Sequence, residues 1–223
     1  EDFAKVNYIY ENTKKVSKRF GFEEFEAPII GKAQMWLEKS GGEIPEQMYV
    51  FESKGKELIA LRPELTPDLA RMVAKKFKEL KKPIKWFSFP RCFRYEQPQS
   101  GRLREFFQYN ADILGGNLTL STFEIVSLLI ELLKSCGLNE KNICVKLNDR
   151  RLTDSILERF DVKQENKQDI MRIIDKRDKL PQKVFLETLG DYFAKPKDFI
   201  AFLDLPLEKM KLNESGENAK KEF

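Results

Sequence analysis

The chain has 223 residues, with 40 Lys and Arg residues against 36 Asp and Glu residues, and it contains no histidine. Without an imidazole, Ser-His-Asp and Cys-His catalytic pairs and histidine-dependent zinc sites are excluded. A charged fraction of 34% together with 41% apolar residues indicates a folded, heavily charged globular protein. No run of residues has the length and apolar character of a membrane span, so we expect no membrane partner.

The cysteines predict the compartment. Cys92, Cys136 and Cys144 are too far apart in sequence for a C-x-x-C pair, and three is an odd number for a disulfide framework. We therefore expect a reducing, cytoplasmic location. The net charge of +4 permits an anionic partner without requiring one.

The first thirty residues predict a helix and a strand. Apolar residues at helical spacing indicate an amphipathic helix over residues 3–19, and Gly21 stands where a glycine commonly ends a helix. Residues 22–30 are typical of a strand. Pro28 lacks the amide proton that a central ladder position needs, so we expect this strand at an edge or an interface.

The middle of the chain predicts mainly strands. Two short apolar runs, 48–51 and 58–61, indicate a β-hairpin, and Thr66 followed by Pro67 is typical of the first turn of a helix. Further patterns predict three strands and then a strongly apolar helix: 85–89, 91–96, 106–114 and 120–135.

The last third of the chain changes character. Residues 143–147 predict a short buried strand, and from residue 151 onward charged helices are interrupted by prolines. The final stretch, 213–223, is nearly all polar and predicts frayed or disordered chain. The order of elements predicts an α+β fold, with an antiparallel sheet flanked by helices in residues 1–150 and a helical appendage in residues 151–223.

The segment from Arg91 to Gly115 holds the residues best suited to chemistry. Arg94 and Glu96 share one face of a predicted strand, because side chains two positions apart point the same way. Alternation places four residues on one face of the next strand: Phe106, Gln108, Asn110 and Asp112. An arginine fork binds phosphate and an aromatic ring stacks on a purine, so this combination suits a nucleoside triphosphate. The amide and carboxylate groups suit a ligand with an ammonium group.

A plainer interpretation of these patterns stays open. Alternating Arg and Glu are also common in a solvated hairpin with cross-strand ion pairs. In the same way, residues 75–85 carry six Lys against one Glu, which fits either an RNA contact or a solvated helix face. Spacing alone does not decide between these interpretations.

Four ordered segments carry a family resemblance. The sequence F-R-Y-E-Q-P-Q-S-G-R-L-R-E-F-F-Q-Y-N-A-D-I-L-G, which begins at Phe93, resembles motif 2 of class II aminoacyl-tRNA synthetases. It is most similar to the histidyl-tRNA synthetase version, especially of the archaeal type. G-F-E-E-F-E-A-P-I-I resembles motif 1, A-L-R-P-E-L-T-P resembles the amino-acid-binding element, and L-N-D-R-R-L resembles the strand before the helical insertion domain. The match is collinear over about residues 1–160.

The resemblance implies roles for the residues that would bind ATP. Arg94 would contact the α-phosphate and the carboxyl group of the amino acid, and would be the catalytic residue. Glu96 would lie beside the adenine amino group, Arg102 would reach the γ-phosphate, and Phe106 would stack on adenine. Mg²⁺ would be bound mainly through the ATP phosphates, and no protein ligands for a metal are identified.

The resemblance also implies the other two binding regions. In the amino-acid site, Glu64, Gln108 and Asp112 would hold the α-amino group of L-histidine, with Thr66 nearby. Three loop residues would meet the acceptor end of tRNA(His): Gln99, Ser100 and Arg102. The implied activity is that of a histidine–tRNA ligase, which forms histidyl-adenylate and transfers histidine to tRNA. A homodimer through the motif 1 region is implied as well.

The sequence departs from the family pattern after the insertion-like helices. A histidine-recognition segment, a glycine-rich motif 3 and an anticodon-binding domain do not follow, so the chain resembles an N-terminal fragment with an incomplete catalytic core. We expect the isolated chain to be weakly active or inactive. Two alternatives remain, namely a non-catalytic paralogue such as the regulatory subunit of ATP phosphoribosyltransferase, and a basic RNA-binding domain without ATP chemistry.

Overall fold

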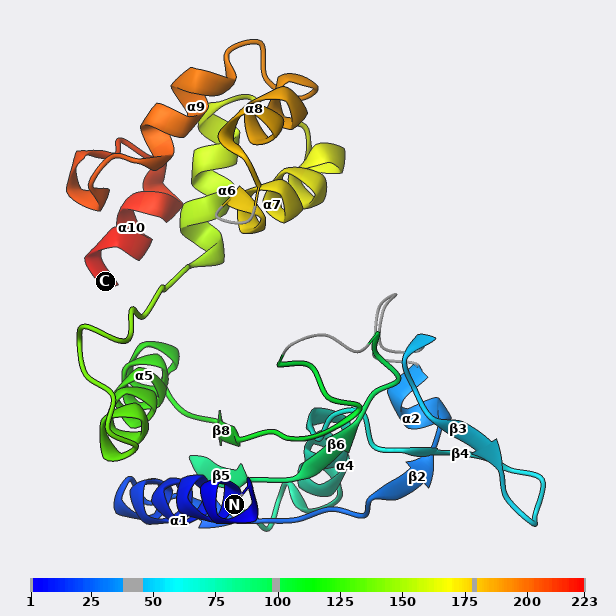
Figure 1. Cartoon of the computed structure of the whole chain (residues 1–223). Helices are drawn as coiled ribbons and strands as arrows, with labels where there is room; N and C mark the ends of the chain where they lie inside the picture. The colour runs from blue at the N-terminus through cyan, green and yellow to red at the C-terminus, as the bar shows by residue number, and fades with distance from the viewer. Residues whose placement is uncertain (1, 38–45, 98–100, 178–179, 223) are drawn as a thin grey trace. The chain divides into compact units, whose positions relative to one another are not determined.

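The computed structural model describes residues 2–37, 46–97, 101–177 and 180–222. Their contacts divide the chain into two compact units, Glu1–Ile143 and Cys144–Phe223, which are coloured blue to green and green to red in Figure 1. The division lies seven residues before the expected boundary at residue 150. In the described residues, no helix is long and apolar enough to cross a membrane.

The first unit is built around a three-stranded sheet in the order β1-β5-β8. Its strands are β1 (Glu23–Glu24), β5 (Ile84–Ser88) and β8 (Asn110–Leu114). β5 pairs antiparallel with β8, so that Trp86 lies opposite Asp112, whereas β1 pairs parallel with β5. This confirms the α+β class and most of the antiparallel pairing.

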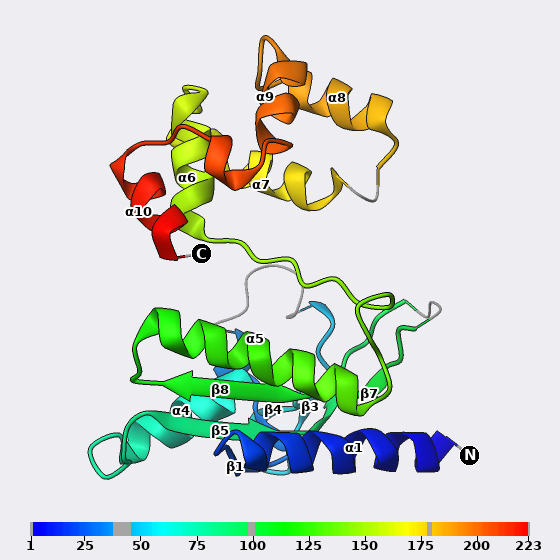
Figure 2. The same cartoon turned by 90° about the vertical axis from the view of Figure 1, so that its left-hand side faces the viewer.

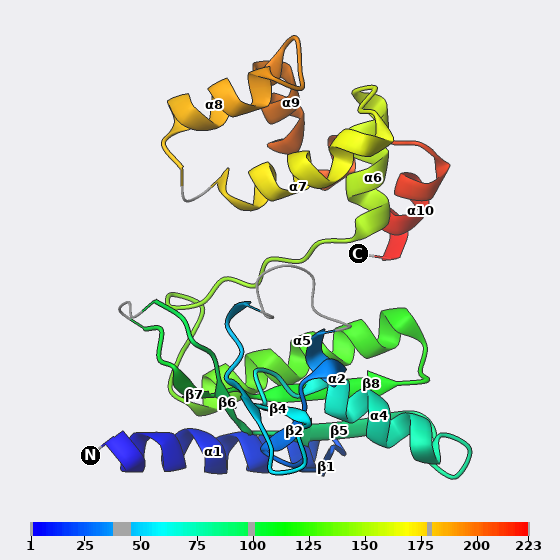
Figure 3. The ribbon, with the colours of Figure 1, turned by 90° about the vertical axis from the view of Figure 1, so that its right-hand side faces the viewer.

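Helices cover both faces of this sheet, as Figures 2 and 3 show from opposite sides. α1 (Asp2–Arg19) and α5 (Leu118–Ser135) pack on one face, where alternate strand residues point toward them. The buried core on that face consists of Val16, Phe22, Phe87, Leu128 and Leu132. α4 (Thr66–Lys76) covers the other face, where its Leu69 and Val73 form a buried cluster with Ile84 of β5. The polar side chain of Asp112 therefore emerges on the α4 face, as alternation requires.

Local sequence explains where these helices begin and end. Gly21 has a φ of +78°, a left-handed conformation that glycine adopts without steric cost, and it ends α1 as predicted. Pro67 occupies the first turn of α4, where its missing amide proton would have no partner in the helix. The side chain of Asn117 caps α5 by accepting a hydrogen bond from the Leu120 amide at 3.0 Å.

The prediction of one strand over residues 22–30 was wrong. β1 ends at Glu24, and β2 (Ile30–Lys32) begins after Pro28 and belongs to a second sheet. The proline, which cannot donate to a ladder, lies in the connection between the two sheets.

The second sheet has the order β2-β4-β3 and contains the predicted hairpin. β3 (Val50–Glu52) and β4 (Leu58–Leu61) pair antiparallel, with Phe51 opposite Ile59. The short helix α2 (Gln34–Leu37) packs its buried Trp36 on this sheet.

A third, two-stranded sheet carries the segment singled out for its chemistry. β6 (Arg91–Phe93) pairs with β7 (Glu105–Phe107), and Cys92 lies opposite Phe106. The predicted strand over residues 106–114 is therefore two strands, β7 and β8, that belong to different sheets. The chain leaves one sheet and enters the other at Gln108, whose amide donates to the Pro90 carbonyl at 3.0 Å.

The second unit consists of helices around its own core. The helices of its described residues are α6 (Arg150–Arg159), η1 (Gln164–Asn166), α7 (Lys167–Asp175), α8 (Gln182–Gly190), α9 (Pro196–Leu203), η3 (Leu207–Lys209) and α10 (Glu214–Glu222). The core combines aliphatic and aromatic residues, and the rings of Phe193 and Phe199 stack with centroids 4.2 Å apart. The predicted helical character of this part is confirmed.

Two predictions near the ends of this unit were wrong. Residues 143–147 form no strand, and Val145 and Leu147 are exposed. The polar stretch after residue 212 forms α10, which packs on α6 and buries Ala219 completely. Side chains in the stretch satisfy the helix start, because Asn213 accepts from the Gly216 amide and Glu217 accepts from the Leu212 amide, each at 2.9 Å.

Gly216 lets α10 approach α6, which gives a test of this packing. A Cβ atom on Gly216 would lie 2.5 Å from Ser155 Oγ and 2.8 Å from Leu212 Cβ. Gly216→Ala gains about 1 kcal/mol of helix propensity, but overpacking typically costs about 1–3 kcal/mol, so we expect a net loss of stability. Urea unfolding followed by circular dichroism measures it.

The matched control is Gly190→Ala at the end of α8, where an added Cβ would meet nothing within 4 Å. This control is expected to leave the unfolding free energy unchanged or slightly raised. Equal effects of the two substitutions would contradict the close packing of α10.

Candidate active site

The site is organised around a buried arginine. The side chain of Arg62 is 2% exposed and follows directly on β4. Its Nε donates to the Arg91 carbonyl at 2.8 Å, and its Nη1 donates to the Ala27 carbonyl at 2.7 Å and to the carboxylate of Glu26. A buried guanidinium needs such partners, because its desolvation is otherwise costly. Arg62 thus ties β6 to the segment before Pro28.

Arg94 follows β6 directly and lies three residues after Arg91. Its Nε donates to the Pro63 carbonyl at 3.0 Å, and its backbone amide donates to the Arg104 carbonyl at 2.9 Å. The guanidinium carbon lies 5.4 Å from the centre of the Phe106 ring, within the range of a cation–π contact. The side chain is only one-fifth exposed, so both its backbone and its head group are held in place.

Glu96 connects Arg94 to the loop arginines. Its carboxylate lies 3.9 Å from Arg94 Nη1 and 3.5 Å from Arg102 Nη1. Its backbone carbonyl accepts from Arg104 Nε at 3.3 Å. Arg102 is 62% exposed, whereas Glu96 is 16% exposed, so the carboxylate is fixed and the outer arginine reaches into solvent.

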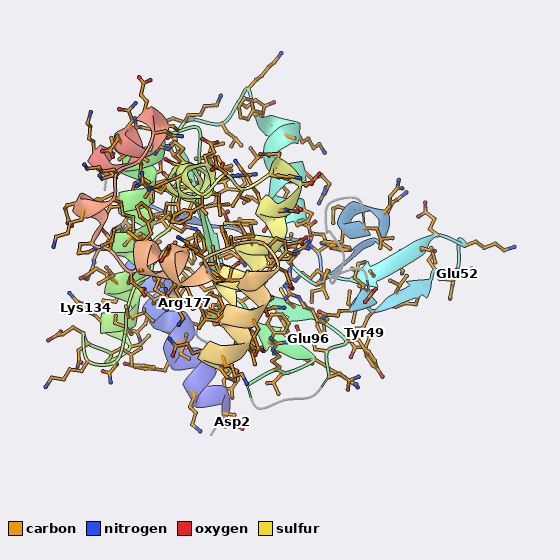
Figure 4. All side chains as sticks on the ribbon, turned by 90° about the horizontal axis from the view of Figure 1, so that it is seen from above. Asp2, Tyr49, Glu52, Glu96, Lys134 and Arg177 are labelled. Atoms are coloured by element: carbon orange, nitrogen blue, oxygen red, sulfur yellow. The ribbon has the colours of Figure 1, made fainter. Side chains whose placement is uncertain are left out.

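Aromatic residues support the outer end of this segment. The guanidinium of Arg104 lies 3.9 Å from the centre of the Tyr95 ring, and Tyr95 packs edge-on against Tyr49 at 5.6 Å. The Tyr95 amide also donates to the Gln47 carbonyl at 2.7 Å. Figure 4 labels Tyr49 and also Glu96, which follows Tyr95 in the chain. The irregular segment after β6, residues 94–96, is thus held on both sides.

The structure therefore brings together the four residues predicted to bind ATP: Arg94, Glu96, Arg102 and Phe106. The other predicted residues come from neighbouring segments. Glu64 follows Pro63, and its carbonyl accepts from Trp36 Nε1 at 3.2 Å. Thr66 is exposed at the first position of α4. Gln99 and Ser100 lie outside the described residues.

Gln108 lies where the chain crosses between sheets, whereas Asp112 lies within β8. Gln108 Oε1 is 4.0 Å from the sulfur of Cys92, a residue of β6. Asp112 is half-buried on β8, opposite Trp86. The predicted polar face is thus interrupted between Phe106 and Asp112, although alternation within β8 is as expected.

Sequence reasoning missed the bridging role of Arg62. The available signal was a charged residue placed directly after the apolar run L-I-A-L and before a proline, a position where burial is costly unless the charge is paired. Sequence reasoning also did not single out Glu26, the carboxylate partner. Among the described residues, no group of three or more Cys, Asp or Glu side chains is placed to hold a metal ion.

The comparisons with known proteins identify the family. The family model described as histidyl-tRNA synthetase matches residues 1–217. The chain belongs to this family. It is 36% identical over 192 residues to a histidine–tRNA ligase of Pyrococcus abyssi, which is 86% of this chain and 44% of that protein. It is 35% identical over 190 residues to the chloroplastic/mitochondrial histidine–tRNA ligase of Arabidopsis thaliana, covering 85% and 39%. This member of the histidyl-tRNA synthetase family thus spans less than half the length of these curated relatives.

Two solved structures share the fold of this histidyl-tRNA synthetase family member. One is described as an ATP phosphoribosyltransferase regulatory subunit/histidyl-tRNA synthetase from Bacillus halodurans, with a TM-score of 0.80, 19% identity, and coverage of 100% of this chain and 59% of that one. The other is a histidyl-tRNA synthetase from Nostoc sp., with a TM-score of 0.76, 18% identity, and coverage of 97% and 51%. These likenesses confirm the predicted fold class.

The packing beneath the site predicts the reactivity of the cysteines. Cys92 is fully buried, and burial raises the pKa of its thiol to about 11, whereas Cys144 is exposed. Because the thiolate is the reactive form, iodoacetamide at pH 8 should alkylate Cys144 and spare Cys92 in the native protein. Peptide mass spectrometry measures both sites, with urea-unfolded protein as the control in which both react. Equal labelling in the native protein would contradict the packing described around β6.

Proposed function

We propose that this chain supplies the ATP- and histidine-binding part of a histidine–tRNA ligase. The observation that carries the proposal is the set of contacts that fixes Arg94 beside Glu96 and Phe106. A held guanidinium beside an aromatic ring and a carboxylate suits a nucleotide, because it offers charge for phosphate, a surface for stacking and an acceptor for the adenine amino group. Membership of the histidyl-tRNA synthetase family supports the same assignment.

The proposed first step needs no imidazole. A carboxylate oxygen of histidine attacks the α-phosphorus of ATP, the bond to the pyrophosphate oxygen breaks, and pyrophosphate leaves. The carboxylate is already ionised at pH 7, so the site must align the reactants and neutralise phosphate charge rather than remove a proton. Arg94 would contact the α-phosphate and the carboxylate, and the exposed Arg102 would reach the γ-phosphate. Mg²⁺ bound to the ATP phosphates would neutralise further charge.

The remaining predicted residues complete the proposal. Glu64, Gln108 and Asp112 would hold the α-amino group of histidine, with Thr66 nearby. Gln99, Ser100 and Arg102 would meet the acceptor end of tRNA(His), where the terminal ribose hydroxyl takes the histidyl group and AMP leaves. Since the chain spans less than half of its curated relatives, we propose that it binds these substrates but turns them over slowly by itself.

A second candidate is a non-catalytic member of the same family that senses histidine. It is supported by the fold shared with the Bacillus halodurans protein, whose description names both a regulatory subunit and a synthetase. The two candidates differ in nucleotide binding. The arrangement of Arg94, Glu96 and Phe106 favours the synthetase, because a histidine sensor has no need of an adenine surface.

Calorimetry with ATP and Mg²⁺, and with a non-hydrolysable histidyl-adenylate analogue, tests the proposal. Arg94→Ala should weaken binding of the analogue at least about 100-fold, because each hydrogen bond to a charged group is worth about 1.5–3 kcal/mol. Arg150→Ala, at an 87% exposed arginine of the second unit, is the control and should bind like the wild type. Binding that survives Arg94→Ala would leave the ATP site without support and favour an RNA-binding role.

We further propose that the chain forms a homodimer through α1 and the segment before Pro28. α1 leaves three large apolar side chains exposed: Phe3, Tyr8 and Ile9. A cavity of about 560 Å³ adjoins it, lined mostly by apolar residues that include Val6, Phe25, Phe89 and Phe107. Exposed apolar surface beside a cavity is typical of a protein interface.

Light scattering at micromolar concentration tests the dimer. Ile9→Lys should shift the mass from two chains toward one, because a charge in an apolar interface is costly to desolvate. Val184→Lys on α8 is the control, since Ile9 and Val184 are equally exposed at 43%. A wild-type mass of one chain, or an equal response to both substitutions, would contradict this interface.

A further inference from the structure

Arg62 forms hydrogen bonds to several separate segments of the chain, through both its side chain and its main chain. Its side chain donates to the carbonyls of Ala27 and Arg91 and to the carboxylate of Glu26. Its main chain accepts from the Phe93 amide at 3.0 Å and donates to the Ile29 carbonyl at 2.8 Å. One residue thereby fixes the spacing between the segment before β2 and the strand β6.

These contacts lead directly to Arg94. The residue after Arg62 is Pro63, which is fully buried, and its carbonyl receives the Nε of Arg94 at 3.0 Å. Because proline fixes its own φ, only the ψ of Pro63 is free to vary between the placement of Arg62 and the direction of this carbonyl. On the other side, the backbone amide of Phe93, the residue before Arg94, donates a hydrogen bond to the Arg62 carbonyl. Arg94 is therefore held from both its backbone and its side chain by groups that Arg62 places.

The geometry requires a guanidinium at this position. Nε and Nη1 donate to carbonyls on two different segments at once, which a planar fork does without rearrangement. A lysine ammonium carries the same charge at a single point and cannot reproduce both directions. The carboxylate partner, Glu26, is 64% exposed, so most of the burial falls on the arginine.

We infer that Arg62 is a positioning residue for nucleotide binding, which acts through Arg94 and not by contact with the nucleotide. The inference rests on the proposed function, because Arg62 affects nucleotide binding only if Arg94 is the group that meets the α-phosphate. A small displacement of that guanidinium weakens every interaction it makes with the phosphate and the carboxylate.

The test compares Arg62→Lys with Arg71→Lys. Arg71 is an exposed arginine of α4 that pairs with Asp68 at 3.3 Å, and it serves as the matched control. Calorimetry with ATP and Mg²⁺ is run where circular dichroism shows each variant fully folded. Arg62→Lys should weaken ATP binding about tenfold or more, and Arg71→Lys should not. The double variant Arg62→Lys with Arg94→Lys should bind no more weakly than Arg94→Lys alone, because the two residues act as one unit.

A second readout does not depend on ATP. The Nε–H proton of Arg94, seen by NMR in arginine-labelled protein, should be protected from exchange in the wild type and in Arg71→Lys, and should lose protection in Arg62→Lys. If Arg62→Lys does not fold, Glu26→Gln replaces it and should give a smaller loss, about threefold in ATP affinity, in the same direction.

These outcomes separate the two claims. Absence of ATP binding in the wild type would contradict the proposed function, and the Arg94 proton would still decide the role of Arg62. Lowered stability of Arg62→Lys with unchanged ATP affinity and an unchanged Arg94 proton would overturn the inference and leave a structural role only. For Glu26→Gln, an unchanged Arg94 proton and affinity would overturn it equally.

Discussion

A guanidinium that is almost fully buried must have its donors satisfied, because removing a charge from water without partners costs several kcal/mol. In this chain the carbonyls and the carboxylate that satisfy Arg62 belong to segments far apart in sequence, around residues 26–29 and 91–93. The requirement therefore holds the end of β4 against β6 and against the connection between β1 and β2. Pro63, which follows Arg62, and Arg94, which follows β6, lie next to these contacts.

The charged groups proposed to meet the nucleotide are arginines and a carboxylate, which agrees with a chain that contains no histidine. Exposure rises outward along the site, from Arg62 at 2%, through Arg94 at 21% and Glu96 at 16%, to Arg102 at 62%. Such a gradient suits the binding of a triphosphate, since a fixed inner charge can align the reacting phosphorus while a solvated outer charge adapts to the terminal phosphate.

The sequence predicted the local features whose cause is local. Gly21 ends α1 because of its backbone freedom, Pro67 begins α4, and alternation sets the faces of β8. The failures have causes that lie between elements. The break at Gln108 arises from pairing with different sheets, and α10 forms because Gly216 and Ala219 fit against α6 despite a polar composition. In the candidate site, motif resemblance predicted Arg94, Glu96, Arg102 and Phe106, which the structure brings together. The contacts of Arg62 depend on distant carbonyls that spacing does not reveal.

The most direct test of the central claim is a crystal structure of the chain with a non-hydrolysable histidyl-adenylate analogue. We predict the adenine ring on Phe106, its amino group beside Glu96, and the guanidinium of Arg94 within hydrogen-bond distance of the phosphate or its replacement, with the Arg62 contacts unchanged. An analogue bound elsewhere, or bound without contact to Arg94, would contradict the assignment of this site.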